Sequence, residues 1–397
     1  MLEQNEHSRV PQPQPEKVED QTRSFSVGVL KEQNKDEKRV ALTPYAVDQL
    51  VSAGFNVYFE SGSGLGANYS DEDYRTSGAK VVDRKTVLDN SDILVKVGPL
   101  SYEEIEQLPR NKVLFSALHP NTQTRENIDL LLKKNITAVA YEFYEESSGM
   151  QPFMFLMNEI VGSTSVMIAA ELLSNSRGGK GVMLGGITGL MPTTVMVLGT
   201  DTAAEYAVRI AMGLGAYVKV FDDDLAGLVR MERLFGQDLF TSSFNRKTLF
   251  KTIQTADVII NSKIKRHDQP FIITEDLVRM MRKGSVIVDM KIDTGSIIET
   301  ARPTSFDNPV YVVHDVIHYC VPNIPSRVAR TASIAISDVL TPILKKICQH
   351  GSILPVLKQS YPLRKGTYAF LGMLTNTHLA ERFGMDAKDL NLLVALF

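Results

Sequence analysis

Short apolar strands alternate with helical segments along almost the whole chain, and few folds accommodate that pattern. The strand candidates are FSVGVLKE, NVYFES, DILVKV, KVLFSAL and ITAVAYEF in the first half, and TVMVLGT, AYVKVFD, ADVIINS and SVIVDM in the second. Helical patterns such as PYAVDQLVSAG and TRENIDLLLKKN lie between several of them. Strands that alternate with helices predict βαβ units and mostly parallel sheets.

The order of these segments predicts two domains. A long helical stretch at about 157–175 separates the two α/β series, and an amphipathic helix at about 328–348 follows the second series. A chain of 397 residues is long enough for two or three domains of roughly 100–200 residues each. We predict an α/β protein with two doubly wound Rossmann-like domains, the first being discontinuous and completed by C-terminal helices. The expected bounds are 25–155 with 330–397 for the first domain and 156–329 for the second.

Composition argues against several classes of protein. The net charge is −3 with no basic block, which excludes the basic stripe of a nucleic-acid-binding surface. The two cysteines, Cys320 and Cys348, have no metal-ligand spacing, so we expect free thiols, a reducing cytoplasmic compartment and no metal site. No apolar run approaches the roughly 20 residues that span a bilayer. Residues 1–24 are polar and rich in Pro, Gln and Glu, which predicts a disordered tail.

The second domain opens with the context of a dinucleotide-binding fingerprint. The strand Thr194–Leu198 runs into a turn and a helix, and the next strand ends at Asp222. Gly199 and Ala204 match the first and third small residues of G-x-G-x-x-G/A, and Thr202 begins the helix. The candidate cofactor contacts are therefore Gly199, Thr202 and Asp222, and the acid favours NAD over NADP. A generic βαβ unit without a ligand is the alternative.

The second position of the fingerprint carries Asp201 instead of glycine. That glycine lets the backbone approach the pyrophosphate, whereas a carboxylate places an anion beside a dianion. Two unit charges about 4 Å apart repel by roughly 4 kcal/mol at an effective dielectric of 20. A fraction of this energy lowers affinity tenfold, so we expect NAD binding to be weakened or lost.

Several stretches together resemble the alanine dehydrogenase family, from about residue 25 to 347. They are VGVLKEQNKDEKRVALTP, ILVKVGP, LFSALH, AYEF, MNEIVG, GKGVMLGGITG, VIVDMKIDTG and HDVIHYCVPNIPSRVARTAS. The resemblance implies reversible, NAD-dependent oxidative deamination of L-alanine to pyruvate and ammonia. It also implies that the first domain binds the small amino or 2-oxo acid, that the second binds NAD, and that the protein is a homo-oligomer.

The resemblance also assigns roles to individual residues. Arg39 stands at the position that binds the substrate carboxylate, for which a planar, bidentate cation is well suited. His119 matches the catalytic histidine at a strand end, where it both donates and accepts a proton near neutral pH. Asp293 matches a carboxylate between the domains that orients water and the amine, and Asn323 is expected near the nicotinamide.

Three departures from the family pattern fall in the same cleft. Gly98 stands where the family has a substrate-binding lysine, and Lys96, two residues earlier, is the candidate replacement. Lys291 stands where a small residue is usual, and we hypothesise that it forms an ion pair with Asp201 inside the cofactor cleft. The stretch 260–266, INSKIKR, carries three cations that either bind another anion or face water, and we expect them to face water.

These features leave two functions open. The first is a working alanine dehydrogenase, or a relative acting on another small amino or 2-oxo acid. The second is a non-catalytic paralogue that has lost NAD binding and acts as a small-ligand-binding or regulatory protein. The framework with Arg39, His119 and Asp293 favours the enzyme, and the departures at 98, 201, 291 and 260–266 favour the paralogue.

Overall fold

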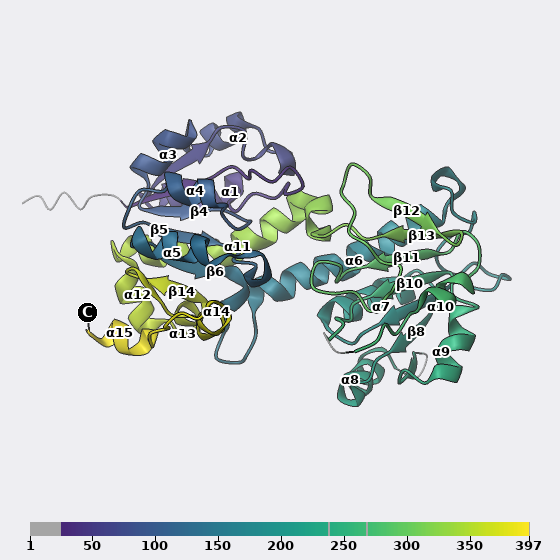
Figure 1. Cartoon of the computed structure of the whole chain (residues 1–397). Coiled ribbons are helices and arrows are strands. Elements are labelled where there is room, and N and C mark those ends of the chain that lie inside the picture. Colours follow the sequence, from purple (N-terminus) through teal and green to yellow (C-terminus); the bar gives the residue numbers. More distant parts are fainter. Residues whose placement is uncertain (1–24, 237–238, 267–268, 397) are drawn as a thin grey trace, which may run out of the picture.

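The computed structural model describes residues 25–236, 239–266 and 269–396, so the predicted tail at 1–24 lies outside the described residues. Two α/β domains lie side by side, and two long helices, α6 (Pro152–Leu173) and α11 (Ala329–Gln349), run between them (Figure 1). The predicted fold class, with a discontinuous first domain, is confirmed.

The first domain is built on an eight-stranded sheet of order β15-β14-β6-β5-β4-β1-β2-β3. Its strands are β1 (Ser26–Val29), β2 (Asn56–Glu60), β3 (Lys80–Val82), β4 (Ile93–Val95), β5 (Val113–Ser116), β6 (Thr137–Ala140), β14 (Thr367–Phe370) and β15 (Met373–Leu374). Its shorter helices are α1 (Pro44–Ser52), α2 (Asp71–Thr76), α3 (Arg84–Asn90), α4 (Tyr102–Gln107), α5 (Arg125–Lys133), α12 (Ile353–Gln359), α13 (Tyr361–Gly366), α14 (Thr377–Phe383) and α15 (Leu390–Leu396). The strands from β3 to β6 are parallel, whereas β14 pairs antiparallel with β6 and β15 with β14. The C-terminal segment therefore adds two short strands to the helices that we predicted there.

The second domain repeats this topology in a seven-stranded sheet of order β12-β13-β11-β10-β7-β8-β9. Its strands are β7 (Thr194–Leu198), β8 (Tyr217–Phe221), β9 (Phe240–Ser242), β10 (Val258–Asn261), β11 (Val286–Asp289), β12 (Val310–Val313) and β13 (Val316–Tyr319). Its helices are α7 (Thr202–Gly213), α8 (Leu225–Phe235), α9 (Arg246–Ile253) and α10 (Glu275–Arg279). Only β12 is antiparallel among the described strands of this sheet. In both domains the strand order reverses between the first and fourth strands, and ligands of open parallel sheets bind at that switch point.

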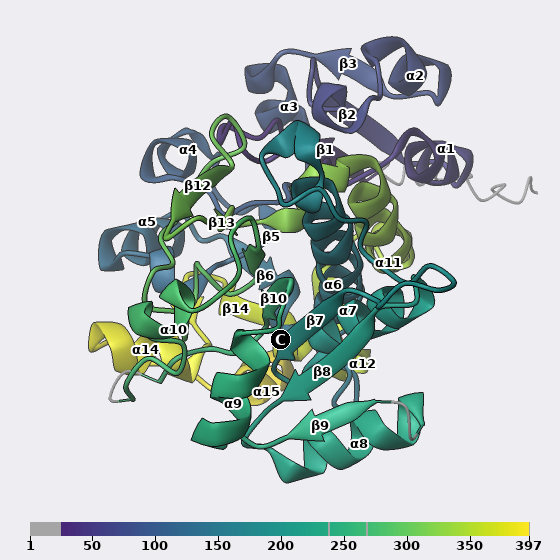
Figure 2. The same cartoon turned by 90° about the vertical axis from the view of Figure 1, so that its right-hand side faces the viewer.

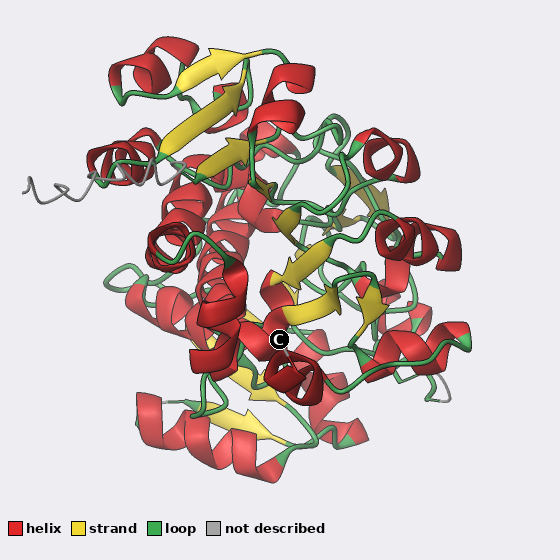
Figure 3. Cartoon of the chain, turned by 90° about the vertical axis from the view of Figure 1, so that its left-hand side faces the viewer, coloured by secondary structure: helices red, strands yellow, loops and turns green. Residues whose placement is uncertain are grey.

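Alternation along each strand divides the core between the two faces of a sheet. Val195 and Val197 of β7 pack in one cluster with helices α6, α7 and α8, whereas Met196 and Leu198 pack in another with α9 and α10. The first domain is divided in the same way by β1 and β4. Helices pack on both faces of each sheet, and Figure 3 shows helices around the strands of the domain nearest the viewer, so functional groups gather at the strand ends.

Helix α6 joins the two domains and is longer than predicted. Pro152 occupies its first turn, where a missing N–H costs nothing, so the helix begins before the expected start near residue 157. Figure 2 shows α6 alongside α7 and α11, and a Cβ built on Gly162 would lie 2.1 Å from the carbonyl oxygen of Ala203 in α7. By length and a mean hydropathy of 1.5 this helix could cross a bilayer, which the sequence analysis did not anticipate. Core helices share such a composition, so this is weak evidence for a membrane span.

Candidate active site

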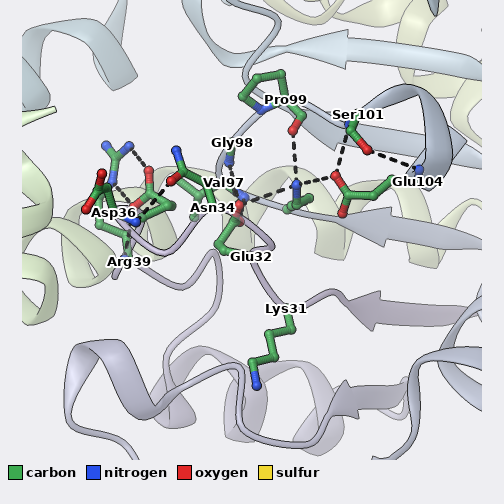
Figure 4. A network of polar contacts seen from close by, with 12 residues as sticks. Lys31, Glu32, Asn34, Asp36, Arg39, Val97, Gly98, Pro99, Ser101 and Glu104 are labelled. Atoms are coloured by element: carbon green, nitrogen blue, oxygen red, sulfur yellow. Dashed lines mark hydrogen bonds and ion pairs between the residues drawn. The ribbon is translucent and has the colours of Figure 1, made fainter. Parts of the chain in front are cut away.

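The candidate residue Lys96 of the first domain lies where β1 and β4 end. Lys31 and Glu32 follow β1, and Lys96 and Gly98 follow β4, so both segments lie at the switch point of this sheet. Figure 4 shows Glu32 directed toward the turn after β4, while Lys31 points away from it.

Lys96 is held in a buried polar cluster. Its side chain is 3% exposed, and Nζ donates to Glu104 Oε2 at 2.9 Å and to the Pro99 carbonyl at 3.0 Å. Glu32 Oε2 lies 3.5 Å from the same ammonium. Its donors are thus engaged by the protein, and a substrate-binding role for Lys96 stays a prediction.

Glu32 fills the space beside Gly98. A Cβ built on Gly98 would lie 3.1 Å from Glu32 Oε2, and the backbone N–H groups of Val97 and Gly98 donate to Glu32 Oε1 at 2.7 and 3.3 Å. Burial raises the pKa of the Glu32 carboxyl to about 7, although Lys96 acts in the opposite direction. Glu32 was not among the predicted site residues, because the sequence marks it only as an acid shortly after the first strand.

Arg39 and Asn323 meet through a residue that was also missed, Glu37. Arg39 Nε donates to Glu37 Oε1 at 2.7 Å and Nη2 donates to Oε2 at 2.5 Å, which is a bidentate pair with both side chains at most 10% exposed. Asn323, at the end of the second domain, donates from Nδ2 to Glu37 Oε2 at 2.8 Å. Burial alone would raise the pKa of Glu37, but Arg39 outweighs it and holds that pKa below its usual value. Tertiary structure therefore brings one predicted residue from each domain onto the same carboxylate.

His119 follows β5, three residues after the strand ends at Ser116, in an unusual backbone conformation. Its φ is 47°, and its N–H donates to Glu142 Oε1 at 2.6 Å, as does the N–H of Leu118 at 2.9 Å. Glu142 thus fixes the turn that leaves the His119 side chain exposed. Asp293 is also exposed, in the turn that comes after β11.

The phosphate turn of the second domain lies between β7 and α7. Gly199 has a φ of 117°, which favours glycine, and a Cβ there would lie 3.2 Å from the backbone of Ser262. Asp201 caps α7 by accepting the Ala204 N–H at 2.9 Å, and it also accepts a hydrogen bond from the Ser262 hydroxyl. Thr202 is the first residue of α7 and is half-buried.

Lys291 pairs with Asp201, as hypothesised. Lys291 Nζ lies 3.0 Å from Asp201 Oδ2, with side chains 17% and 39% exposed. The pair neutralises the carboxylate that the sequence analysis expected to repel a pyrophosphate. The same carboxylate engages an N–H at the helix N-terminus, which is the kind of donor that binds phosphate groups.

Asp222 lies at the end of β8, as the fingerprint requires, but its oxygens are engaged. It is 4% exposed and accepts from Thr200 Oγ1 at 2.9 Å, from the Asp224 N–H at 3.0 Å and from Lys263 Nζ. Lys263 also contacts Asp223. The expectation that the cations of 260–266 face water is therefore wrong for Lys263, because a buried carboxylate favours a partner of opposite charge.

The backbone of the cleft and the residue types that line it fit NAD. The strand–turn–helix, the positive φ of Gly199 and the acid at 222 all stand where a dinucleotide needs them. The polar groups that would contact NAD now contact side chains of the protein. Binding therefore requires that these internal contacts give way.

Comparisons with known proteins match nearly the whole chain. The family model described as "Alanine dehydrogenase/PNT, N-terminal domain" matches residues 28–161, and "Alanine dehydrogenase/PNT, C-terminal domain" matches residues 165–377. An alanine dehydrogenase of Methanococcus maripaludis is 36% identical over 360 residues, which cover 89% of this chain and 95% of that protein. That of Bacillus subtilis is 35% identical, covering 91% of this chain and 95% of its own.

Solved structures agree with the sequence matches. An L-alanine dehydrogenase superposes with a TM-score of 0.83 at 34% identity, covering 91% of this chain and 99% of the other. A transhydrogenase from Sinorhizobium meliloti superposes with a TM-score of 0.75 at 22% identity, covering 89% of this chain and 99% of its own, and indicates the fold alone.

Proposed function

The chain belongs to the alanine dehydrogenase/PNT family, and from that premise we propose that it catalyses the oxidative deamination of L-alanine to pyruvate and ammonia. In the balanced reaction, L-alanine, NAD⁺ and water give pyruvate, ammonium, NADH and a proton. The observation that carries the proposal is the pairing of Arg39 with Glu37, which Asn323 of the second domain also contacts. A substrate held by Arg39 lies beside the loop that ends the cofactor domain.

Each candidate residue has a distinct task in this proposal. Arg39 binds the substrate carboxylate through Nη1, whose contact is the weak acceptor Met157 Sδ at 3.4 Å, because Nε and Nη2 are committed to Glu37. His119, exposed on a turn fixed by Glu142, holds and returns the proton of the carbinolamine hydroxyl. Asp293 orients the attacking water and the amine from the second domain. Lys96 remains the proposed substrate-binding lysine, acting through the cluster that it shares with Glu32.

NAD is the proposed cofactor, and when bound it would supply a hydride acceptor for the substrate carbon. Gly199, Thr202 and Asp222 would hold it along the turn and the end of β8, with Asn323 near the nicotinamide. Asp201 weakens this binding through its occupation of the helix N-terminus. The residues 25–155 with 330–397 form the proposed substrate domain, and 156–329 the NAD domain. We also propose a cytoplasmic homo-oligomer whose ligands are small amino and 2-oxo acids.

A non-catalytic paralogue gains no support from the relatives, because those that match over nearly their full length are named alanine dehydrogenases. The ion pairs at Asp201 and Asp222 bear on how tightly NAD binds. They leave Arg39 and His119 in place.

The test is alanine-dependent formation of NADH by the purified protein, followed by absorbance. We expect turnover, and we expect His119→Asn to abolish it while NADH binding, measured by calorimetry with and without pyruvate, is unchanged. His350→Asn, another exposed histidine, is the matched control and keeps full activity. An inactive wild-type protein that binds NADH would refute the catalytic assignment. Absence of NADH binding at millimolar concentration would instead support the alternative of a non-catalytic paralogue that has lost NAD binding.

A further inference from the structure

We propose that Lys263 is an intramolecular occupant of the adenosine end of the dinucleotide cleft and that it sets the cleft's affinity. This inference rests on the proposed NAD site. Lys263 is the residue that a bound ribose must displace, and no sequence motif marks it.

Asp222, the carboxylate that would bind the adenosine ribose, accepts hydrogen bonds from three groups of the protein. Asp222 Oδ2 accepts from Thr200 Oγ1, and Oδ1 accepts both the Asp224 N–H and Lys263 Nζ. The carboxylate is 4% exposed. A ribose hydroxyl that donates to Asp222 Oδ1 must take the place of Lys263, since the other donor to that oxygen is the Asp224 N–H of the adjoining turn.

The backbone of Lys263 is fixed in position by Asn261. The side-chain amide of Asn261, itself fully buried on β10, accepts the Lys263 N–H at 3.0 Å and donates to the Lys263 carbonyl at 3.2 Å. These two hydrogen bonds fix the backbone of Lys263. Its side chain extends across the end of the sheet to Asp222 and is 20% exposed. Burial alone lowers the pKa of Lys263, but hydrogen bonds to Asp222 and Asp223 outweigh it and raise that pKa, so the group stays an ammonium.

The preceding residue, Ser262, likewise contacts a carboxylate of the cleft, at the phosphate turn. The Ser262 hydroxyl donates to Asp201, and the Ser262 backbone lies 3.2 Å from a Cβ built on Gly199. Two consecutive residues after β10 thus contact the two carboxylates that line the cleft. The segment Ser262–Lys263 lies at the switch point between β7 and β10, where a dinucleotide is expected.

The chemistry gives the direction of the effect. An ammonium is a donor only, so it competes with the ribose hydroxyls for the oxygens of Asp222. Removal of the ammonium frees one charged acceptor for the ligand. We expect about tenfold tighter binding, which corresponds to about 1.4 kcal/mol.

The experiment measures ADP-ribose binding by calorimetry. ADP-ribose carries the adenosine ribose and the pyrophosphate but no nicotinamide, so the result does not depend on turnover. The variants are Lys263→Ala and the milder Lys263→Gln, with melting temperatures recorded to show that both fold. Lys265→Ala is the matched control, because Lys265 lies in the same segment with Nζ 5.0 Å from the Phe271 ring.

Tighter binding in both Lys263 variants, with Lys265→Ala unchanged, supports the proposal. Equal or weaker binding in the Lys263 variants overturns it, and weaker binding would make Lys263 a ligand of the ribose. Failure of the proposed function is a separate result: a wild-type protein without alanine-dependent turnover, whose Lys263 variants still bind ADP-ribose more tightly, refutes the enzyme and keeps the role of Lys263. Absence of ADP-ribose binding in every variant overturns both.

Discussion

Replacement of Asp201 by Asn isolates the charge at the phosphate turn, because the shape and the helix cap are retained. Asn and Asp are equally good at an N-cap position, so the amide oxygen still accepts the Ala204 N–H. Only the carboxylate charge and its pairing with Lys291 are lost. The net charge of the pair changes from zero to +1 beside the position of a pyrophosphate.

The size of the effect depends on distance and exposure. One unit charge about 4 Å from another contributes roughly 4 kcal/mol at an effective dielectric of 20. Asp201 is 39% exposed, so solvent screening reduces this to about 1–2 kcal/mol. We therefore expect NADH to bind about five- to thirtyfold more tightly to Asp201→Asn than to the wild-type protein.

Calorimetric titration with NADH at low and high salt is the assay. The gain in affinity should shrink as salt increases, since the interaction is screened. Asp83→Asn is the control, because Asp83 caps α3 through the Thr86 N–H at 2.9 Å in the other domain. An NADH dissociation constant for Asp201→Asn within about twofold of wild type would refute the electrostatic reasoning.

Three further outcomes test the structure itself. A double-mutant cycle of Asp201→Asn and Lys291→Ala, followed by chemical denaturation, should give a coupling of about 0.5–1 kcal/mol, and purely additive effects would contradict a stabilising pair. Burial raises the pKa of Glu32 to about 7 from 4.5, so its contribution to stability is full below pH 4.5 and is lost as pH rises through 7. Glu32→Gln should therefore flatten the pH dependence of unfolding by about 3 kcal/mol across that window, and an unchanged profile would argue against the raised pKa. Gly162→Ala should destabilise the fold by about 1–3 kcal/mol, because the added Cβ would lie 2.1 Å from the Ala203 carbonyl oxygen. Gly213→Ala is the control and should be neutral, because there is open space around that position. Equal melting temperatures for the two variants would refute the close packing of α6 against α7.

The sequence by itself determined the fold class and predicted where along the chain the candidate site residues lie. Short, continuously apolar strands in alternation with helices of period 3.6 admit little besides doubly wound sheets, and the order of segments placed Gly199 and Asp222 at strand ends. The two terminal strands β14 and β15 were missed, because segments of four and two residues carry too little periodicity.

The sequence also predicted the pairing of Asp201 with Lys291, since two departures of opposite charge at one sheet edge favour each other. The environment predicted for Lys263 was wrong. A run of cations in a loop is usually solvated, and nothing in the sequence near residue 263 indicates the buried carboxylate that it contacts.

Tertiary structure alone decided which groups the candidate residues contact. Glu37, which pairs with Arg39, contacts Asn323 across 286 positions of sequence, and Lys263 reaches Asp222 across 41. Local sequence determines where a strand ends and which residues form the turn after it. The partner of a charged group at that end depends on which strands become neighbours, because the low dielectric between packed elements makes an unpaired charge costly and a paired one tolerable.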